Sequence, residues 1–130
     1  MKIKENDILS NSEIFILEKG EPTKKKIEIF FRNKKVILFG VPGAYTSVCS
    51  KKHLPSYINM YEKFKEKGID HIICVSVNDP FVMNAWGEEH KVNNKVIMMA
   101  DPFLNFTKDI GAEVNKSGRG LGIRSNRYVM

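Results

Sequence analysis

The clearest structural signal of this chain is the stretch Val36-Ile37-Leu38-Phe39-Gly40-Val41-Pro42-Gly43-Ala44-Tyr45-Thr46-Ser47-Val48-Cys49. Its first part, residues 36–40, is mostly β-branched, aliphatic or aromatic and predicts a short buried strand. Pro42-Gly43 ends the strand, and apolar residues then recur at helical spacing at Leu54, Tyr57, Ile58 and Tyr61. We therefore expect Cys49 in the first turn of a helix that runs to about Lys67, ends at Gly68 and bends at Pro55, which has no N–H for the helical ladder.

Cys49 has the surroundings of a reactive cysteine. At a helix N-terminus, unpaired backbone N–H groups and the helix dipole favour the thiolate over the thiol, and the thiolate is the nucleophile. The alternative is a small buried hydrophobic residue, the commoner role of a single cysteine. His53 follows four residues later on the same helical face. A protease-like cysteine–histidine pair is thus a second, less favoured interpretation, because no nearby Asn or Asp is positioned to orient the ring.

The remaining sequence alternates strand and helix patterns. We expect an antiparallel pair from Glu13–Glu18 and Ile27–Phe31, joined through Gly20-Glu21-Pro22, and core strands at His71–Val77 and Val96–Met99. Asp79-Pro80 and Asp101-Pro102 each combine a capping carboxylate with a proline suited to a helix start. The first of these helices has an expected apolar face of Phe81, Val82, Ala85 and Trp86, and Gly111 ends the second. This order predicts one α/β domain over residues 1–130, with its sheet covered on both faces.

Composition excludes several classes of function. The chain has 130 residues, 42% apolar and 28% charged, which suits one globular domain with its own core. Its net charge of +6 comes from scattered lysines, so we do not expect nucleic-acid binding. No apolar run approaches the roughly 20 residues of a membrane span, so we expect no membrane association. A metal site is not expected either, because the two cysteines and three histidines are scattered.

The N-terminus bears on the expected location of the protein. Residues Met1–Asp7 have neither the apolar core of a secretion signal nor the acid-poor composition of a transit peptide. Two cysteines without a secretion signal indicate a reducing compartment. We expect the cytoplasm, or an organelle if an upstream targeting extension has been removed.

The spacing of Pro42, Thr46 and Cys49 resembles the active-site signature of the peroxiredoxins, which are thiol peroxidases. The resemblance covers most of the chain from about Asn6 onward, and it is closest to the plant type II and animal atypical two-cysteine subgroup. It continues, in order, through Ser50-Lys51-Lys52-His53-Leu54-Pro55, Val75–Met83 with Trp86, Ala100-Asp101-Pro102 and Gly120–Tyr128.

The resemblance implies a thioredoxin-like fold, with a central mixed sheet flanked by helices, and no cofactor. It assigns Cys49 as the peroxidatic cysteine, which attacks a hydroperoxide and becomes a sulfenic acid. Thr46 would direct its hydroxyl at the sulfur and the peroxide, with a helix cap as the alternative role. Pro42 would shield the thiolate from bulk water. Arg127, directly before an aromatic residue, matches the active-site arginine of the family.

Three further residues have a less direct expected role. Arg124 competes with Arg127 and is expected as a supporting ion-pair residue, whereas His53 is expected in the pocket wall. Cys74 is either a buried thiol or the resolving cysteine that plant type II relatives carry at the same separation. We favour the buried thiol, because a disulfide needs Cα atoms within about 7 Å and a mid-strand residue cannot reach Cys49 without local unfolding. Reduction would then come from an external thiol, namely thioredoxin, glutaredoxin or glutathione.

The resemblance has one departure at its end. The chain stops at Met130, three residues past Arg127, whereas relatives continue through a strand pair and a C-terminal helix. The C-terminal part of the family fold is therefore expected to be missing, through truncation or because a partner subunit supplies it, and the last strand should leave an exposed edge. Relatives form dimers, so we expect a homodimer. The alternative to a peroxidase is a non-catalytic thioredoxin-fold binding or chaperone module.

Overall fold

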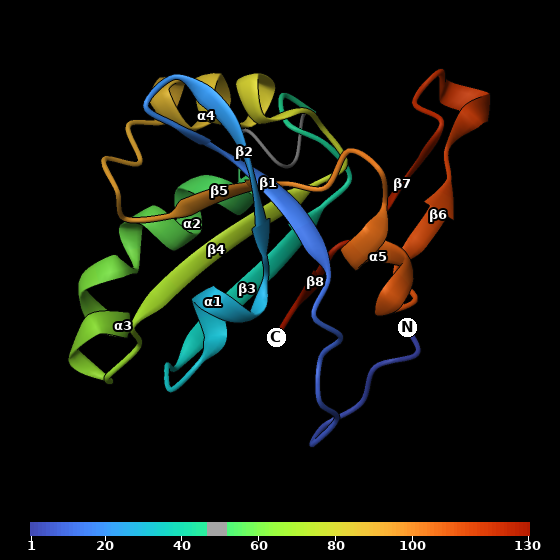
Figure 1. Cartoon of the computed structure of the whole chain (residues 1–130). Coiled ribbons are helices and arrows are strands. Elements are labelled where there is room, and N and C mark those ends of the chain that lie inside the picture. Colours follow the sequence, from blue (N-terminus) through green and yellow to red (C-terminus); the bar gives the residue numbers. More distant parts are fainter. Residues whose placement is uncertain (47–51) are drawn as a thin grey trace.

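A mixed β-sheet forms the centre of the molecule in the computed structural model, which describes residues 1–46 and 52–130 (Figure 1). The strand order is β2-β1-β5-β4-β3-β8; β3, β4 and β5 are parallel, while β1 and β8 run antiparallel to β5 and β3. The strands are β1 Glu13–Glu18, β2 Glu21–Lys26, β3 Val36–Val41, β4 His71–Ser76, β5 Ile97–Ala100 and β8 Tyr128–Val129. A separate hairpin of β6 Glu113–Asn115 and β7 Ile123–Ser125 stands beside the sheet.

Helices cover both faces of the sheet. The helices are α1 Glu28–Phe31, α2 Leu54–Asn59, α3 Tyr61–Glu66, α4 Pro80–Glu89 and α5 Asn105–Asp109. One core cluster, around Phe39 and Trp86, lies under α2, α3 and α4, and the other, around Leu38 and Phe106, lies under α1 and α5. Neighbouring residues of β3 thus enter opposite clusters, as the alternation of side chains along a strand requires. The expected mixed sheet flanked by helices is confirmed.

The first strand pair differs from its prediction. The partner of β1 is residues 21–26, whereas residues 28–31 form the short helix α1. Lys19 and Gly20 both have positive φ, at 51° and 79°, and Glu18 pairs directly with Glu21. This two-residue turn has the backbone twist that hairpins favour, so the return strand begins earlier than the apolar pattern indicated.

The long helix predicted up to Lys67 is interrupted. It consists of α2 and α3, separated at Met60, whose φ and ψ are −92° and 1°. Pro55 is the second residue of α2, and the π-helical residues Lys52 and His53 directly precede α2. A bend at Pro55 stays a prediction, because residues 47–51 lie outside the described part of the chain. The predicted position of Cys49 at the start of this helix lies outside the described residues.

A carboxylate accepts backbone N–H groups at the beginning of each of the later helices, α4 and α5. Asp79 Oδ1 accepts a hydrogen bond from the backbone N–H of Val82 at 2.8 Å, which confirms the predicted cap of α4. Asp101, only 1% exposed, accepts from the backbone N–H groups of Phe106 and Thr107 and from the Thr107 hydroxyl, at 3.3, 2.8 and 2.7 Å. The capping role of Asp101 is thus confirmed, but α5 begins four residues later, so the proline that follows Asp101 is not in its first turn.

The buried face of α4 agrees with its prediction at Trp86 and at the partly buried Val82, and differs at the other two positions. Met83, Trp86 and Gly87 face the core, whereas Phe81 is 56% exposed and Ala85 is exposed. The rotation of this helix is set by the contact of its side chains with the sheet, which a local apolar pattern does not reveal.

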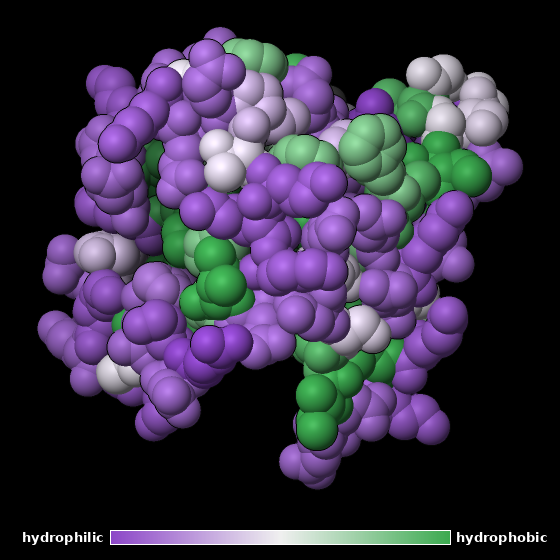
Figure 2. Space-filling view, in the orientation of Figure 1, coloured by the Kyte–Doolittle hydropathy of each residue, from purple (hydrophilic) through white to green (hydrophobic). Residues whose placement is uncertain are grey.

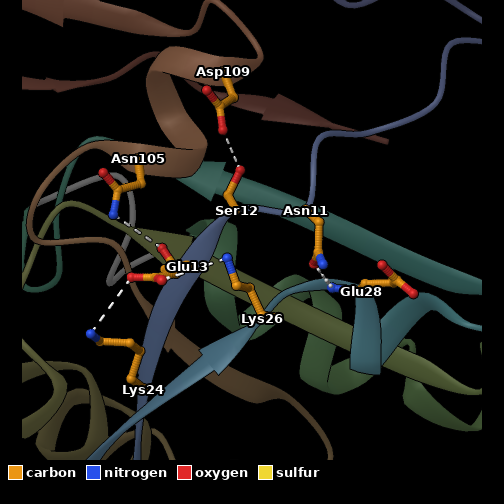
Figure 3. A network of polar contacts seen from close by, with 8 residues as sticks. All are labelled: Asn11, Ser12, Glu13, Lys24, Lys26, Glu28, Asn105 and Asp109. Atoms are coloured by element: carbon orange, nitrogen blue, oxygen red, sulfur yellow. Dashed lines mark hydrogen bonds and ion pairs between the residues drawn. The ribbon is translucent and has the colours of Figure 1, made fainter.

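A polar network ties the start of β1 to both flanking helices (Figure 3). The Ser12 hydroxyl donates to Asp109 in α5, and Asn11 Oδ1 accepts from the backbone N–H of Glu28 in α1 at 3.2 Å. The Glu13 carboxylate pairs with two lysines of the neighbouring strand β2, and its carbonyl accepts from Asn105 at 3.4 Å. These contacts fix the entry of the chain into the sheet.

The sheet has an exposed edge at β8, as expected. Val129 is 59% exposed, and no further strand pairs with β8 among the described residues. An apolar hollow of about 440 Å³ lies beside it, and its lining includes Ile8, Phe31, Leu38 and Met130. Figure 2 shows a notch in the lower outline of the molecule at this place, bordered by hydrophobic surface on the N-terminal arm.

Candidate active site

The loop after β3 is held in place by Arg124 of β7. Its guanidinium Nη1 donates to the carbonyl of Pro42 at 3.1 Å, and its Nε donates to the carbonyl of Leu121 at 2.9 Å. The guanidinium occupies the space that a Cβ on Gly43 would take, so a larger residue there would make the Arg124 side chain shift. Arg124 therefore supports the pocket through backbone carbonyls; the contacts described for it include no carboxylate, in contrast to the expected ion pair.

Asn78 holds the same loop from the other side, a role that the sequence analysis did not assign. Its Oδ1 accepts from the backbone N–H of Ala44 at 2.9 Å and from the hydroxyl of Ser76, at the end of β4, at 2.6 Å. The sequence carried a signal for this role, because Asn78 lies between the core strand β4 and the helix cap Asp79. Ligand-binding residues of parallel sheets gather at that end of the strands.

Thr46 is the last residue of this loop that the structure describes. Its hydroxyl donates to the carbonyl of Gly43 at 2.8 Å, and its backbone N–H lies 3.4 Å from the same oxygen. Because a hydroxyl has one hydrogen and two lone pairs, Thr46 keeps acceptor capacity for a further donor. Pro42 is buried, as expected for a residue that excludes water. Cys49, the predicted nucleophile, lies outside the described residues.

Arg127 and His53 meet in a surface hollow. The hollow has a volume of about 480 Å³ and is lined by Lys52, His53, Ser56, Arg127, Tyr128 and Val129. Arg127 Nη1 lies 3.5 Å from Nδ1 of His53, although 74 positions separate the two in sequence. Since a guanidinium only donates, this contact assigns Nδ1 as the acceptor and the proton of the neutral ring to Nε2. The structure thus brings together two residues that the sequence analysis placed at the pocket.

The environment of His53 keeps its ring neutral. Partial burial lowers the pKa of His53 below its ordinary value of 6.5, and the positive charge of Arg127 lowers it further. The ring lies 5.1 Å from that of Phe39 and 5.7 Å from that of Tyr57. Phe39 and Tyr57 stack on each other at 3.9 Å and 5°. An aromatic wall from β3 and α2 therefore supports the histidine.

Cys74 is in the middle of β4 and is fully buried. It pairs in register with Phe39 of β3 and Met98 of β5, so strands flank it on both sides. Burial raises the pKa of the Tyr57 phenol, and the neighbouring Cys74 raises it further. The thiol thus has the core position that the sequence analysis favoured for it.

Two absences hold for residues 1–46 and 52–130, which the structure describes. No group of three His, Cys, Asp or Glu side chains among them gathers closely enough to hold a metal ion. None of the helices described combines the length and the apolar character that a membrane crossing requires.

Comparison with known proteins decides the family. The family model described as Redoxin matches residues 6–130. Peroxiredoxin-2B of Arabidopsis thaliana is 44% identical over 126 residues, which cover 97% of this chain and 70% of that protein. The chain belongs to the peroxiredoxin family. This peroxiredoxin chain is also 52% identical to Peroxiredoxin-2C of Oryza sativa subsp. japonica over 97 residues, which cover 75% of this chain.

Solved structures agree with this assignment. The crystal structure of reduced Prx3 from Vibrio vulnificus in complex with H2O2 superposes with a TM-score of 0.93 at 43% identity, covering 98% of this chain and 80% of that one. The matched peroxiredoxins are longer. The aligned part of this chain spans only 60% of the length of the rice relative.

Proposed function

We propose that this chain is a thiol peroxidase in which Cys49 reduces hydrogen peroxide and small organic hydroperoxides. The observation that carries the proposal is the contact between Arg127 and His53. It brings a guanidinium from the far end of the chain to a residue four positions from Cys49 in the sequence. Membership of the peroxiredoxin family supports the proposal, as does the hydrogen peroxide named in the Vibrio vulnificus complex.

The reaction is a two-electron displacement at oxygen. The Cys49 thiolate attacks the terminal oxygen of the hydroperoxide, so that an S–O bond forms while the O–O bond breaks. The leaving alkoxide or hydroxide takes up a proton and departs as an alcohol or water. The sulfur loses the two electrons that the peroxide gains, and Cys49 becomes a sulfenic acid.

Three neighbours of the loop and hollow serve this step. Arg127 supplies a positive charge and a planar set of N–H donors, which favour the thiolate and stabilise the charge that moves to the leaving oxygen. Thr46 accepts a hydrogen bond from the peroxide O–H, because its own hydrogen already serves the Gly43 carbonyl. Pro42 lines the loop as a buried wall that limits water.

An external thiol returns Cys49 to its reduced form. A first thiol attacks the sulfenic acid and releases water, which leaves a mixed disulfide, and a second thiol then exchanges to free Cys49. Thioredoxin, glutaredoxin and glutathione are the reductants of this class. The buried mid-strand position of Cys74 supports a structural role for that thiol.

We also propose that the protein works as a homodimer in the cytoplasm. The dimer is proposed from the family resemblance, and Tyr45, which is 48% exposed in the loop after β3, is a residue that an interface near the site would cover. The free thiol of Cys74 supports a reducing compartment, where thiols stay reduced. Sedimentation of the purified chain tests the dimer, since a monomer at micromolar concentration contradicts it.

The decisive experiment follows one turnover. Reduced protein in excess is mixed with hydrogen peroxide in a stopped-flow instrument, and the product is trapped with a sulfenic-acid reagent and mapped by mass spectrometry. We expect rapid peroxide loss with label on Cys49, no reaction in Cys49→Ser and normal reaction in the matched control Cys74→Ser. Slow peroxide loss in the wild type, equal to that of Cys49→Ser, would instead favour a non-catalytic module.

A further inference from the structure

The strand that delivers Arg127 is short. β8 comprises Tyr128 and Val129, which pair with Gly40 and Phe39 of β3. Beyond them, Met130 and Leu38 exchange two backbone hydrogen bonds of 2.8 Å. So few ladder bonds specify register weakly, since a slip by one residue would cost little in backbone pairing.

A side-chain interlock strengthens this weak pairing. The ring atoms Cδ1, Cε1 and Cζ of Tyr128 all lie within 2.9 Å of the point that a Cβ on Gly40 would occupy. The ring therefore rests directly on the glycine backbone, in a space that any other residue at position 40 would fill. Cross-strand contacts between an aromatic ring and a glycine are a known means of fixing strand register.

The Tyr128 hydroxyl does not explain the position of its ring. It is buried, and the described residues give it no hydrogen-bond partner. Burial raises the pKa of the Tyr128 phenol far above its ordinary value, and the neighbouring Asp101 raises it further. Such a hydroxyl adds desolvation cost without a compensating bond, so the ring acts through its shape.

Because side chains alternate between the two faces of a sheet, the contact of Tyr128 with Gly40 also bears on the position of Arg127. Tyr128 packs against the core cluster that contains Leu38, on the face covered by α1 and α5. Adjacent residues of an extended segment point to opposite faces, and Arg127 accordingly contacts His53 beside α2. A slip of one residue would exchange the two faces and withdraw the guanidinium from the hollow.

We propose that Gly40 and Tyr128 are positioning residues, which lock the register of β8 and thereby hold the Arg127 guanidinium against His53. The catalytic meaning of this lock rests on the proposed peroxidase function, but the lock itself does not. Its direct readout is the titration of the His53 ring, because burial lowers the pKa of His53 first and the charge of Arg127 lowers it further.

The test compares Gly40→Ala with Gly118→Ala, in which the added methyl meets nothing within 4 Å. The pKa of His53 is measured by NMR in the wild type, in Arg127→Gln and in each glycine variant. We expect Gly40→Ala to raise this pKa as Arg127→Gln does, and Gly118→Ala to leave it unchanged. In the Arg127→Gln background, Gly40→Ala should add no further rise.

Two tyrosine variants keep the proposal testable if Gly40→Ala does not fold. Tyr128→Phe keeps the ring and loses only the unpartnered hydroxyl, so it should retain the wild-type titration of His53. Tyr128→Ala removes the ring and should raise the pKa of His53 only while Arg127 is present. An equal rise with and without Arg127 would overturn the proposal, because solvation of the hollow alone would then explain it.

Peroxide consumption gives a second readout. Gly40→Ala and Tyr128→Ala should lower the rate by about ten- to a hundredfold, the cost of a displaced catalytic group, while the control Gly118→Ala stays at the wild-type rate. A wild-type rate in Tyr128→Ala would overturn the proposal. If the wild type consumes no peroxide, the proposed function fails, while the His53 titration still decides whether the lock positions Arg127.

Discussion

The replacement of Arg127 by lysine separates two roles that the arginine can have. Arg127→Lys keeps the positive charge but loses the planar set of N–H donors, which is not a conservative change at a site that recognises two atoms. If the charge alone is needed to favour the thiolate, lysine should restore most of the activity. If the donors hold the peroxide in the transition state, it should not.

The charge and the donors of Arg127 have effects of different size. The contact of Arg127 with His53 is 3.5 Å long and exposed, so its loss should change the folding stability by at most about 1 kcal/mol. A positive charge about 4 Å from a thiolate is worth a few kcal/mol at an effective dielectric constant of about 20, for lysine and arginine alike. Loss of preorganised donors costs about 10²–10³ in rate, or about 2.7–4 kcal/mol of transition-state stabilisation. We therefore predict a large loss of rate with little loss of stability.

Arg124→Lys is the matched control, with the opposite expected pattern. Arg124 donates to two backbone carbonyls at 3.1 and 2.9 Å. Its replacement should cost about 1–3 kcal/mol of folding stability while changing the rate by less than about tenfold. Stopped-flow peroxide consumption and urea unfolding of both variants measure the two quantities. Peroxide reduction by Arg127→Lys at the wild-type rate would refute the assignment of Arg127.

Four other predictions concern the two thiols and the buried carboxylate of Asp101. Iodoacetamide should alkylate Cys49 much faster than Cys74 in the folded protein at neutral pH, as followed by peptide mapping; equal rates would contradict the reactive position of Cys49. Cys74→Ser should keep peroxide turnover with a glutathione- or glutaredoxin-type reductant and lose about 1 kcal/mol of stability, and a Cys49–Cys74 disulfide as the main oxidised product would overturn this. Asp101→Ala should lower the free energy of unfolding by about 2–4 kcal/mol, because it removes a helix cap and leaves the buried Thr107 hydroxyl without its acceptor. Burial raises the pKa of Asp101 above its ordinary 3.8, so the native state binds this proton more tightly than the unfolded chain and the stability should fall as the pH rises from about 4. Urea midpoints across this range should show the slope in the wild type and its loss in Asp101→Asn, and an unchanged slope would argue against it.

Much of the framework follows from local sequence. The apolar runs at 36–41 and 71–76 are buried strands because each can pack on both faces, and Asp79-Pro80 starts a helix because its cap acts within one turn. The predicted partner of the first strand is wrong, because the positive φ values of Lys19 and Gly20 make a tight turn there. The return strand therefore begins before the apolar alternation of residues 27–31. The break between α2 and α3 at Met60 has no signal in the sequence, because the helical spacing of apolar residues continues across it.

The candidate site depends on contacts between distant parts of the chain. The prediction that Pro42, Thr46 and Cys49 follow one strand comes from the sequence alone, because it depends on neighbours a few positions apart. The contacts of Arg124 with the Pro42 carbonyl and of Arg127 with His53 are seen only in the folded chain. Those partners are separated by 82 and 74 positions, and their meeting depends on how β7 and β8 lie beside the loop and β3. The packing of Tyr128 on Gly40 sets that arrangement for β8, and a contact of this kind has no local signature, since it exists only once the two strands are paired.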